Sequence, residues 1–164
     1  MKYAIVYSSR TGNTKMLADT LRDALPKKEC VYFGGPDAAA LSAEKIYVGF
    51  WTDKGTCDEQ TADFLKKLTD QKVFLFGTAG FGISQEYFDK ILARTEKNIR
   101  KEAAVTGRFM CQGKMPVSVR KRYEKIQASG IEIPNMQGMI ENFDKALTHP
   151  DKEDLEAFKK AALQ

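Results

Sequence analysis

The sequence predicts an α/β fold in which helices cover both faces of a doubly wound, five-stranded parallel sheet. Three observations lead to this prediction. Segments typical of strands alternate with segments typical of helices. The run KVFLF at residues 72–76 is apolar at each position after its lysine, as a strand buried on both faces requires. No linker, repeat or low-complexity stretch interrupts the 164 residues, so we expect a single domain.

Each expected strand is a short run rich in β-branched and aromatic residues. The five strands are expected at residues 2–7, 29–33, 46–50, 72–76 and 102–111. Gly34, Gly35 and Pro36 break the chain after the second strand, so the next element must start afresh.

The expected helices carry apolar side chains at helical spacing. In the first, at residues 13–25, Met16, Leu17 and Leu21 share one face, and Pro26 ends the helix. Residues 37–43 have room for only about two helical turns. Longer helices are expected at residues 58–68, 84–95, 117–128, 136–147 and 152–163. Asp151 is a suitable N-cap for the last of them.

The composition is that of a globular protein with a mildly basic surface. The net charge is +4, yet no nucleic-acid-binding motif accompanies the basic residues. We therefore expect no nucleic-acid partner and favour an acidic protein or small molecule. No apolar run is long enough to span a membrane, and the first residues lack the layout of a signal peptide. A cytoplasmic protein without a membrane span is expected.

The cysteine and histidine content argues against metal and hydrolytic chemistry. Cys30, Cys57 and Cys111 are well separated, and His149 is the single histidine. Zinc sites need clustered ligands, and catalytic triads need a histidine beside a nucleophile. We expect reduced structural thiols, no metal and no catalytic side chain.

The loop SSRTGNT, at residues 8–14, follows the first expected strand and opens the first expected helix. Ligands of open α/β sheets bind beyond the carboxyl ends of the strands. Four hydroxyl groups, a glycine and the N-terminus of a helix offer donors to a phosphate monoester without a lysine or a metal. The simpler alternative is an ordinary helix cap with incidental threonines.

This loop, placed directly after a first strand, resembles the phosphate loop of the flavodoxins, which holds the phosphate of FMN. The resemblance extends over the whole chain and implies a flavodoxin-like three-layer sandwich with strand order 2-1-3-4-5 and an FMN site. The role of Arg10 stays open. By resemblance, the phosphate ligands are Ser8, Ser9, Thr11, Gly12, Asn13 and Thr14.

Two later loops resemble the loops that flank the flavin ring in this family. In the first, residues 49–59, Trp51 stands just past the third strand, where its indole can stack on the ring. Core packing is the alternative for a lone tryptophan. In the second, GTAGFGIS at residues 77–84, the glycines let backbone amides reach the pyrimidine edge of the ring. That contact is assigned to Thr78, Ala79, Gly80, Phe81 and Gly82. The loop lacks the Gly-x-Gly-x-x-Gly order of NAD-binding sites.

Two features depart from the family pattern. Many flavodoxins place a glycine directly after the stacking aromatic, whereas this chain has Thr52, which is poorly suited to a positive φ. A turn at Gly55 is expected in its place. Typical flavodoxins are strongly acidic, and this chain is basic. The positive charge predicts a less negative reduction potential and an acidic partner.

The predicted function is that of an FMN-binding, flavodoxin-like redox protein that transfers electrons to or from a partner protein. The alternative is an FMN-dependent oxidoreductase that acts directly on a quinone or an acidic tetrapyrrole. The basic stretch at residues 108–125 fits either function, because it can border the flavin or form a solvated helix face.

Overall fold

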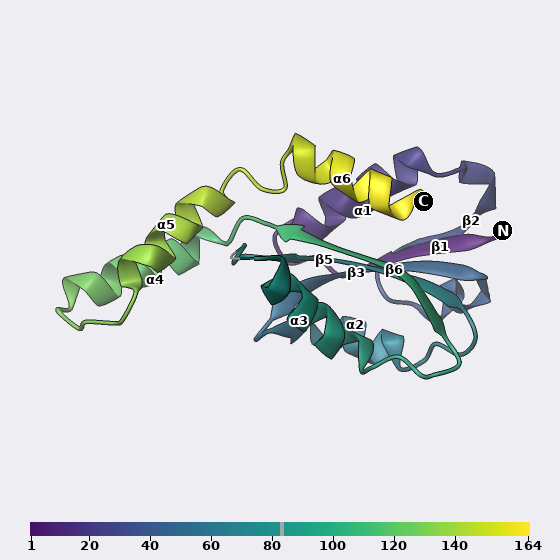
Figure 1. The fold of residues 1–164 in the computed structure, drawn as a ribbon, viewed down its shortest axis with the longest axis horizontal. Helices are drawn as coiled ribbons and strands as arrows, with labels where there is room; N and C mark the ends of the chain where they lie inside the picture. Colours follow the sequence, from purple (N-terminus) through teal and green to yellow (C-terminus); the bar gives the residue numbers. More distant parts are fainter. Residues whose placement is uncertain (83) are drawn as a thin grey trace.

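The computed structural model describes residues 1–82 and 84–164 and shows a twisted sheet between two layers of helices (Figure 1). The sheet has the order β2-β1-β3-β5-β6, and each adjacent pair is parallel. Counted over these five strands, the predicted order 2-1-3-4-5 is confirmed. The strands are β1 (Tyr3–Tyr7), β2 (Cys30–Gly34), β3 (Lys45–Asp53), β5 (Lys72–Ala79) and β6 (Ala104–Gln112).

A short strand, β4 (Thr56–Cys57), was not predicted. β3 continues past its expected end to Asp53 and pairs antiparallel with β4. Lys54 and Gly55 both have positive φ, as in the two-residue turns that match the twist of a hairpin. The expectation of a loop was therefore wrong for residues 51–53 and 56–57, which belong to paired strands, whereas the expected turn at Gly55 is confirmed as part of the turn of this hairpin.

The helices divide between the two faces of the sheet, which confirms the three-layer sandwich (Figure 1). α1 (Asn13–Ala24) and α6 (Lys152–Ala162) cover one face, and α2 (Glu59–Leu65) and α3 (Gln85–Glu96) cover the other. Two short 3₁₀ helices, η1 (Lys27–Glu29) and η2 (Ala38–Ser42), flank β2. The second replaces the short helix expected at residues 37–43.

Alternating side chains along the strands build one apolar layer on each face. On β1, Tyr3 and Ile5 face α1 and α6, whereas Ala4 and Val6 face the opposite helices. Phe158 of α6 is fully buried, and its ring lies 4.9 to 6.3 Å from the rings of three phenylalanines of β5 and β6. This aromatic cluster holds the C-terminal helix on the sheet.

Two helices leave the sandwich. α4 (Val117–Ala128) and α5 (Met136–Ala146) form a hairpin that projects beyond the carboxyl ends of the strands (Figure 1). Tyr123 of α4 and Phe143 of α5 are buried in its small core. Arg120 pairs with Glu124 and with Asp144, which joins the two helices. The sequence predicted both helices but not their projection.

The chain returns to the sheet through a hydrogen-bonded junction. The His149 carbonyl accepts a hydrogen bond from the Lys114 N–H at 2.9 Å, which closes the base of the hairpin. Asp151 and Asp154 form a reciprocal capping box at the start of α6, as expected for an N-cap at Asp151. His149 Nδ1 lies 2.6 Å from the Asp154 carboxylate.

In the part of the chain that the structure describes, no helix is long and apolar enough to cross a bilayer.

Two glycine–phenylalanine pairs fix the register between β3 and β5. Gly49 lies opposite Phe76, and Phe50 lies opposite Gly77 in the ladder. A Cβ atom at either glycine would overlap the phenylalanine ring that covers it. The two rings lie on opposite faces of the sheet. Each ring occupies the space above its partner glycine, and a larger residue at that glycine would leave no room for the ring.

We expect Gly77→Ala to lower the free energy of unfolding by about 1–3 kcal/mol, because the added methyl group overpacks the core against Phe50. Urea unfolding measures the change. Gly35→Ala is the matched control, since the nearest atom to its added carbon is 4.0 Å away and its effect should stay within about 0.5 kcal/mol. Equal stability of the two variants would contradict the proposed interlock.

Candidate functional site

A cavity of about 300 Å³ opens beyond the carboxyl ends of β1, β3 and β5, at the base of the projecting hairpin. It brings together most of the predicted site residues, while Ser8, Gly12 and Gly82 stay outside its lining. The predicted residues that line it are Ser9, Thr11, Asn13, Thr14, Trp51, Thr52, Gly55, Thr78, Ala79, Gly80 and Phe81. The additional lining residues are Arg10, Lys54, Tyr87, Lys114, Met115, Pro116 and Val119.

The loop between β1 and α1 presents backbone donors to this cavity. Gly12 adopts φ 90° as the N-cap of α1, a conformation that favours glycine. The Ser9 hydroxyl accepts a hydrogen bond from the Lys15 N–H at 3.2 Å and so caps the helix from a distance. Within the described residues, no acceptor pairs with the N–H groups of residues 10–14. With the positive end of the helix dipole, these N–H groups suit a dianion.

The buried side chain of Thr14 holds this loop against the sheet. Its hydroxyl donates to the Phe50 carbonyl at 2.9 Å and lies 3.1 Å from the Thr78 hydroxyl. The side chain is 1% exposed. Its hydroxyl therefore ties α1 to β3 and β5, and the group that Thr14 can offer to a ligand is its backbone N–H.

Asn13 connects the same loop to the segment that follows β6. Its Nδ2 donates to the Lys114 carbonyl at 2.8 Å, and the Thr11 hydroxyl approaches the same oxygen at 3.5 Å. Asn13 is 6% exposed and lines the cavity, and its Oδ1 accepts no hydrogen bond from any described residue. A buried amide oxygen without a donor is costly, so this atom is suited to a donor supplied by a ligand.

The hairpin that carries Trp51 is anchored by a buried carboxylate. Asp58 is 2% exposed and accepts hydrogen bonds from the Trp51 N–H at 3.4 Å and from both the N–H and the hydroxyl of Thr61. The Thr52 hydroxyl donates to the Thr78 carbonyl at 2.9 Å. The indole is half-buried, and the Arg10 guanidinium lies 5.4 Å from its ring centre.

At the end of β5 and the start of the loop that follows it, three successive carbonyl groups are hydrogen-bonded, whereas the next N–H groups have no partner among the described residues. The carbonyls of Thr78, Ala79 and Gly80 each accept a hydrogen bond from another part of the chain. Among the described residues, none accepts from the N–H groups of residues 80–82. Ile83, inside the predicted loop 77–84, lies outside the described residues. The loop is therefore a set of donors for a ligand with acceptor atoms.

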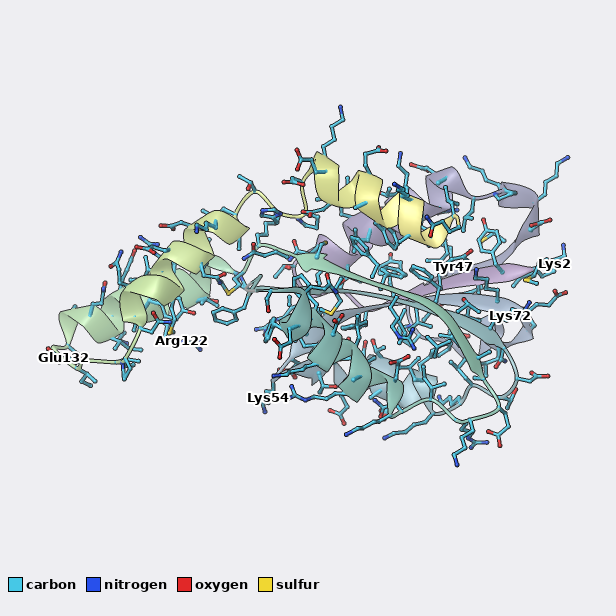
Figure 2. All side chains as sticks on the ribbon, in the orientation of Figure 1. Lys2, Tyr47, Lys54, Lys72, Arg122 and Glu132 are labelled. Carbon is cyan, nitrogen blue, oxygen red and sulfur yellow. The ribbon has the colours of Figure 1, made fainter. Side chains whose placement is uncertain are left out.

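Charge around the cavity has one sign. Arg10, Lys54 and Lys114 are exposed, and none of the described lining residues is acidic. Burial raises the pKa of Tyr87, although Arg94 opposes the shift, so its phenol stays neutral at physiological pH. Figure 2 shows Lys54 at the same end of the molecule as the projecting hairpin, whereas Lys2 and Lys72 lie at the opposite end of the strands.

The cysteines play no visible part in this site. Cys57 and Cys111 are buried, and burial raises the pKa of both thiols. Both stay protonated near neutral pH, which suits structural packing and opposes nucleophilic or redox chemistry.

Sequence reasoning missed the wall from α3, whereas the wall from the segment after β6 lies in the basic stretch 108–125, which was expected to border the flavin or to form a solvated helix face. Within that stretch, no role was assigned to Met115 or Pro116. Tyr87 lies in the first turn of α3, and Val119 lies in the first turn of α4. Nothing in their local sequence distinguishes them from ordinary apolar helix positions.

Comparison with known proteins identifies the family. The model of the flavodoxin domain matches residues 4–163. The flavodoxin-like domain-containing protein BilS of Clostridium symbiosum (strain WAL-14163) is 42% identical, over 96% of this chain and 92% of that protein. BilS of Clostridioides difficile (strain CD3) is 28% identical, over 94% of this chain and 90% of that protein.

The fold also has counterparts among solved structures. Oxidised flavodoxin 2 from Bacillus cereus superposes with a TM-score of 0.61 at 18% identity, over 98% of this chain and 94% of that one. This likeness concerns the fold. The match of the domain model over nearly the whole length and the 42% identity to BilS of Clostridium symbiosum show that the chain belongs to the flavodoxin family.

Proposed function

We propose that this chain is a single-domain, FMN-binding redox protein that transfers electrons to or from a partner protein. FMN is the cofactor of the flavodoxin family, to which the chain belongs. The observation that carries the proposal is one cavity, bordered both by N–H groups at the start of α1 that have no acceptor among the described residues and by the Trp51 ring.

The donors of the cavity fit the parts of FMN. The N–H groups of Arg10, Thr11, Asn13 and Thr14 and the hydroxyl of Ser9 suit the phosphate. Trp51 borders the region that suits a flat ring, and the N–H groups of Gly80 and Phe81 suit its carbonyl oxygens. The orphan Oδ1 of Asn13 suits a hydroxyl donor of the ribityl chain. When bound, FMN supplies the electron-carrying ring, so no catalytic acid or base is needed from the chain.

The positive cavity rim favours acidic partners. Arg10, Lys54 and Lys114 stand at the cavity, and α4 carries four basic residues and one acidic residue. Arg120 is already occupied by Glu124 and Asp144, so it is not available to a partner. Opposite charges steer association, and positive charge beside a reduced, anionic ring stabilises that ring.

None of the three cysteines is in a disulfide, which supports a reducing compartment such as the cytoplasm.

A second function is favoured by the apolar wall of the cavity. Met115, Pro116 and Val119 line it together with Phe81 and Tyr87. An apolar wall beside basic side chains is suited to a flat molecule that bears carboxylates. The alternative is therefore an FMN-dependent oxidoreductase that acts directly on a quinone or an acidic tetrapyrrole.

We expect FMN to bind on the order of 100-fold more tightly than riboflavin, because the loss of the phosphate removes at least two charge-assisted hydrogen bonds. Quenching of flavin fluorescence during titration of the apoprotein measures both affinities. Equal affinities would contradict the phosphate role of residues 10–14. Failure to bind either flavin would overturn the proposed function.

We expect the reduced protein to be reoxidised by ferricyanide more slowly as ionic strength rises from about 10 mM to about 300 mM, because salt screens the basic rim. Stopped-flow absorbance measures the rate. The double variant Lys54→Glu, Lys114→Glu should lower the low-salt rate and flatten the salt dependence. The control Lys2→Glu, Lys72→Glu makes the same charge change at the far end of the strands and should change little (Figure 2). A rate that rises with salt in the unmodified protein would contradict a basic rim.

The two functions are separated by how reoxidation depends on the concentration of a small acceptor. For an electron carrier, the rate with a carboxylated quinone should rise linearly with quinone concentration. For an oxidoreductase it should saturate, because the substrate occupies a site beside Met115 and Val119. Saturation that Val119→Asp abolishes, while ferricyanide reoxidation is kept, would favour the alternative.

A further inference from the structure

The projecting hairpin is hydrogen-bonded to the loop after β5. Asn142, on α5, donates its Nδ2 hydrogen to the Gly80 carbonyl at 3.0 Å. Gln112, at the end of β6, donates to the same carbonyl at 2.9 Å and also approaches Asn142 Oδ1 at 3.0 Å. Three groups from distant parts of the chain thus form a closed triangle.

The triangle fixes the orientation of one peptide group. Two donors occupy both lone pairs of the Gly80 oxygen. In a planar trans peptide, the N–H of the next residue, Phe81, points to the side opposite the carbonyl. Gly80 and Phe81 line the cavity, whereas Asn142 and Gln112 do not. The carbonyl is therefore held on the side away from the cavity, which turns the Phe81 N–H toward it.

The orientation of the peptide group between Gly80 and Phe81 has to be fixed by hydrogen bonds from other parts of the chain. Gly80 has no side chain to limit its backbone, and glycine peptides rotate more freely than others. The preceding carbonyls are already fixed, Thr78 by the Thr52 hydroxyl and Ala79 by the Gly113 N–H. A Cβ atom at Gly80 would lie only 2.7 Å from Met115 Sδ, so the loop sits close beneath the base of the hairpin.

We propose that Asn142 is a positioning residue that holds the Gly80–Phe81 peptide with its N–H directed at an acceptor of the bound ligand. The inference rests on the proposed function, with FMN as that ligand. If Asn142 were only a structural tie between hairpin and sheet, its loss would change stability without changing how the ligand is held.

Asn142→Asp isolates the contact. The aspartate keeps the shape of asparagine and the Oδ1 acceptor for Gln112, but it replaces the donor to Gly80 with an acceptor. Asn142→Ala removes both contacts without adding charge. Gln137→Ala and Gln137→Glu are the matched controls, because Gln137 is an exposed amide on the same helix whose side chain bonds only Glu141 among the described residues.

We expect Asn142→Ala to weaken FMN binding about fivefold and Asn142→Asp about tenfold, as titration of the apoprotein by fluorescence quenching measures. The two-electron reduction potential should become more negative in both variants, because a misdirected N–H stabilises the reduced ring less. Both Gln137 variants should stay within about twofold of the unmodified protein in affinity. The unfolding temperature of each apoprotein, measured in parallel, reports the purely structural effect.

The inference is overturned if both Asn142 variants match the Gln137 controls in FMN affinity and potential, even if they unfold at lower temperature. Should Asn142→Ala fail to fold, the isosteric Asn142→Asp still decides the question. Failure of the unmodified protein to bind FMN would instead overturn the proposed function, and the inference with it. Titration of the unmodified apoprotein with FMN, done first, distinguishes these two outcomes.

Discussion

The register between β3 and β5 is the constraint on which the site depends. Phe50 over Gly77 and Phe76 over Gly49 permit one alignment, since a shift by one residue would place each ring against a neighbour with a side chain. That alignment sets Trp51 opposite Thr78. The hydroxyls of Thr52 and Thr14 then reach Thr78, which joins β3, α1 and β5 at the edge where the cavity opens.

The cavity follows one rule of hydrogen bonding on two of its sides. Around the start of α1 and after β5, N–H groups lack partners among the described residues, while the Gly80 carbonyl beside them accepts two side-chain hydrogen bonds. Arg10, Lys54 and Lys114 add positive charge without a described acidic neighbour in the lining. Such a site favours ligands rich in acceptors and negative charge, and the neutral donors bind them without the desolvation cost of buried ions.

The strand order and most helices could be predicted from the sequence because they depend on local patterns. The strand β4 could not, since its turn places Lys54 at positive φ, where no local signal favours lysine. The inward hydroxyl of Thr14 depends on the register of two distant strands. The projection of α4 and α5 depends on their apolar faces meeting each other, through Tyr123 and Phe143, while amphipathic spacing shows only that each face needs a partner.

The projecting hairpin supplies a wall of the cavity and also contacts the loop after β5. Its base supplies Met115 and Val119 to the lining, its second helix bonds the Gly80 carbonyl, and its first helix carries exposed cations such as Arg122 (Figure 2). The shape of the cavity and the orientation of the Gly80 carbonyl therefore depend on one element. That element is joined to the sheet through a short connection in which the Lys114 N–H donates to the His149 carbonyl.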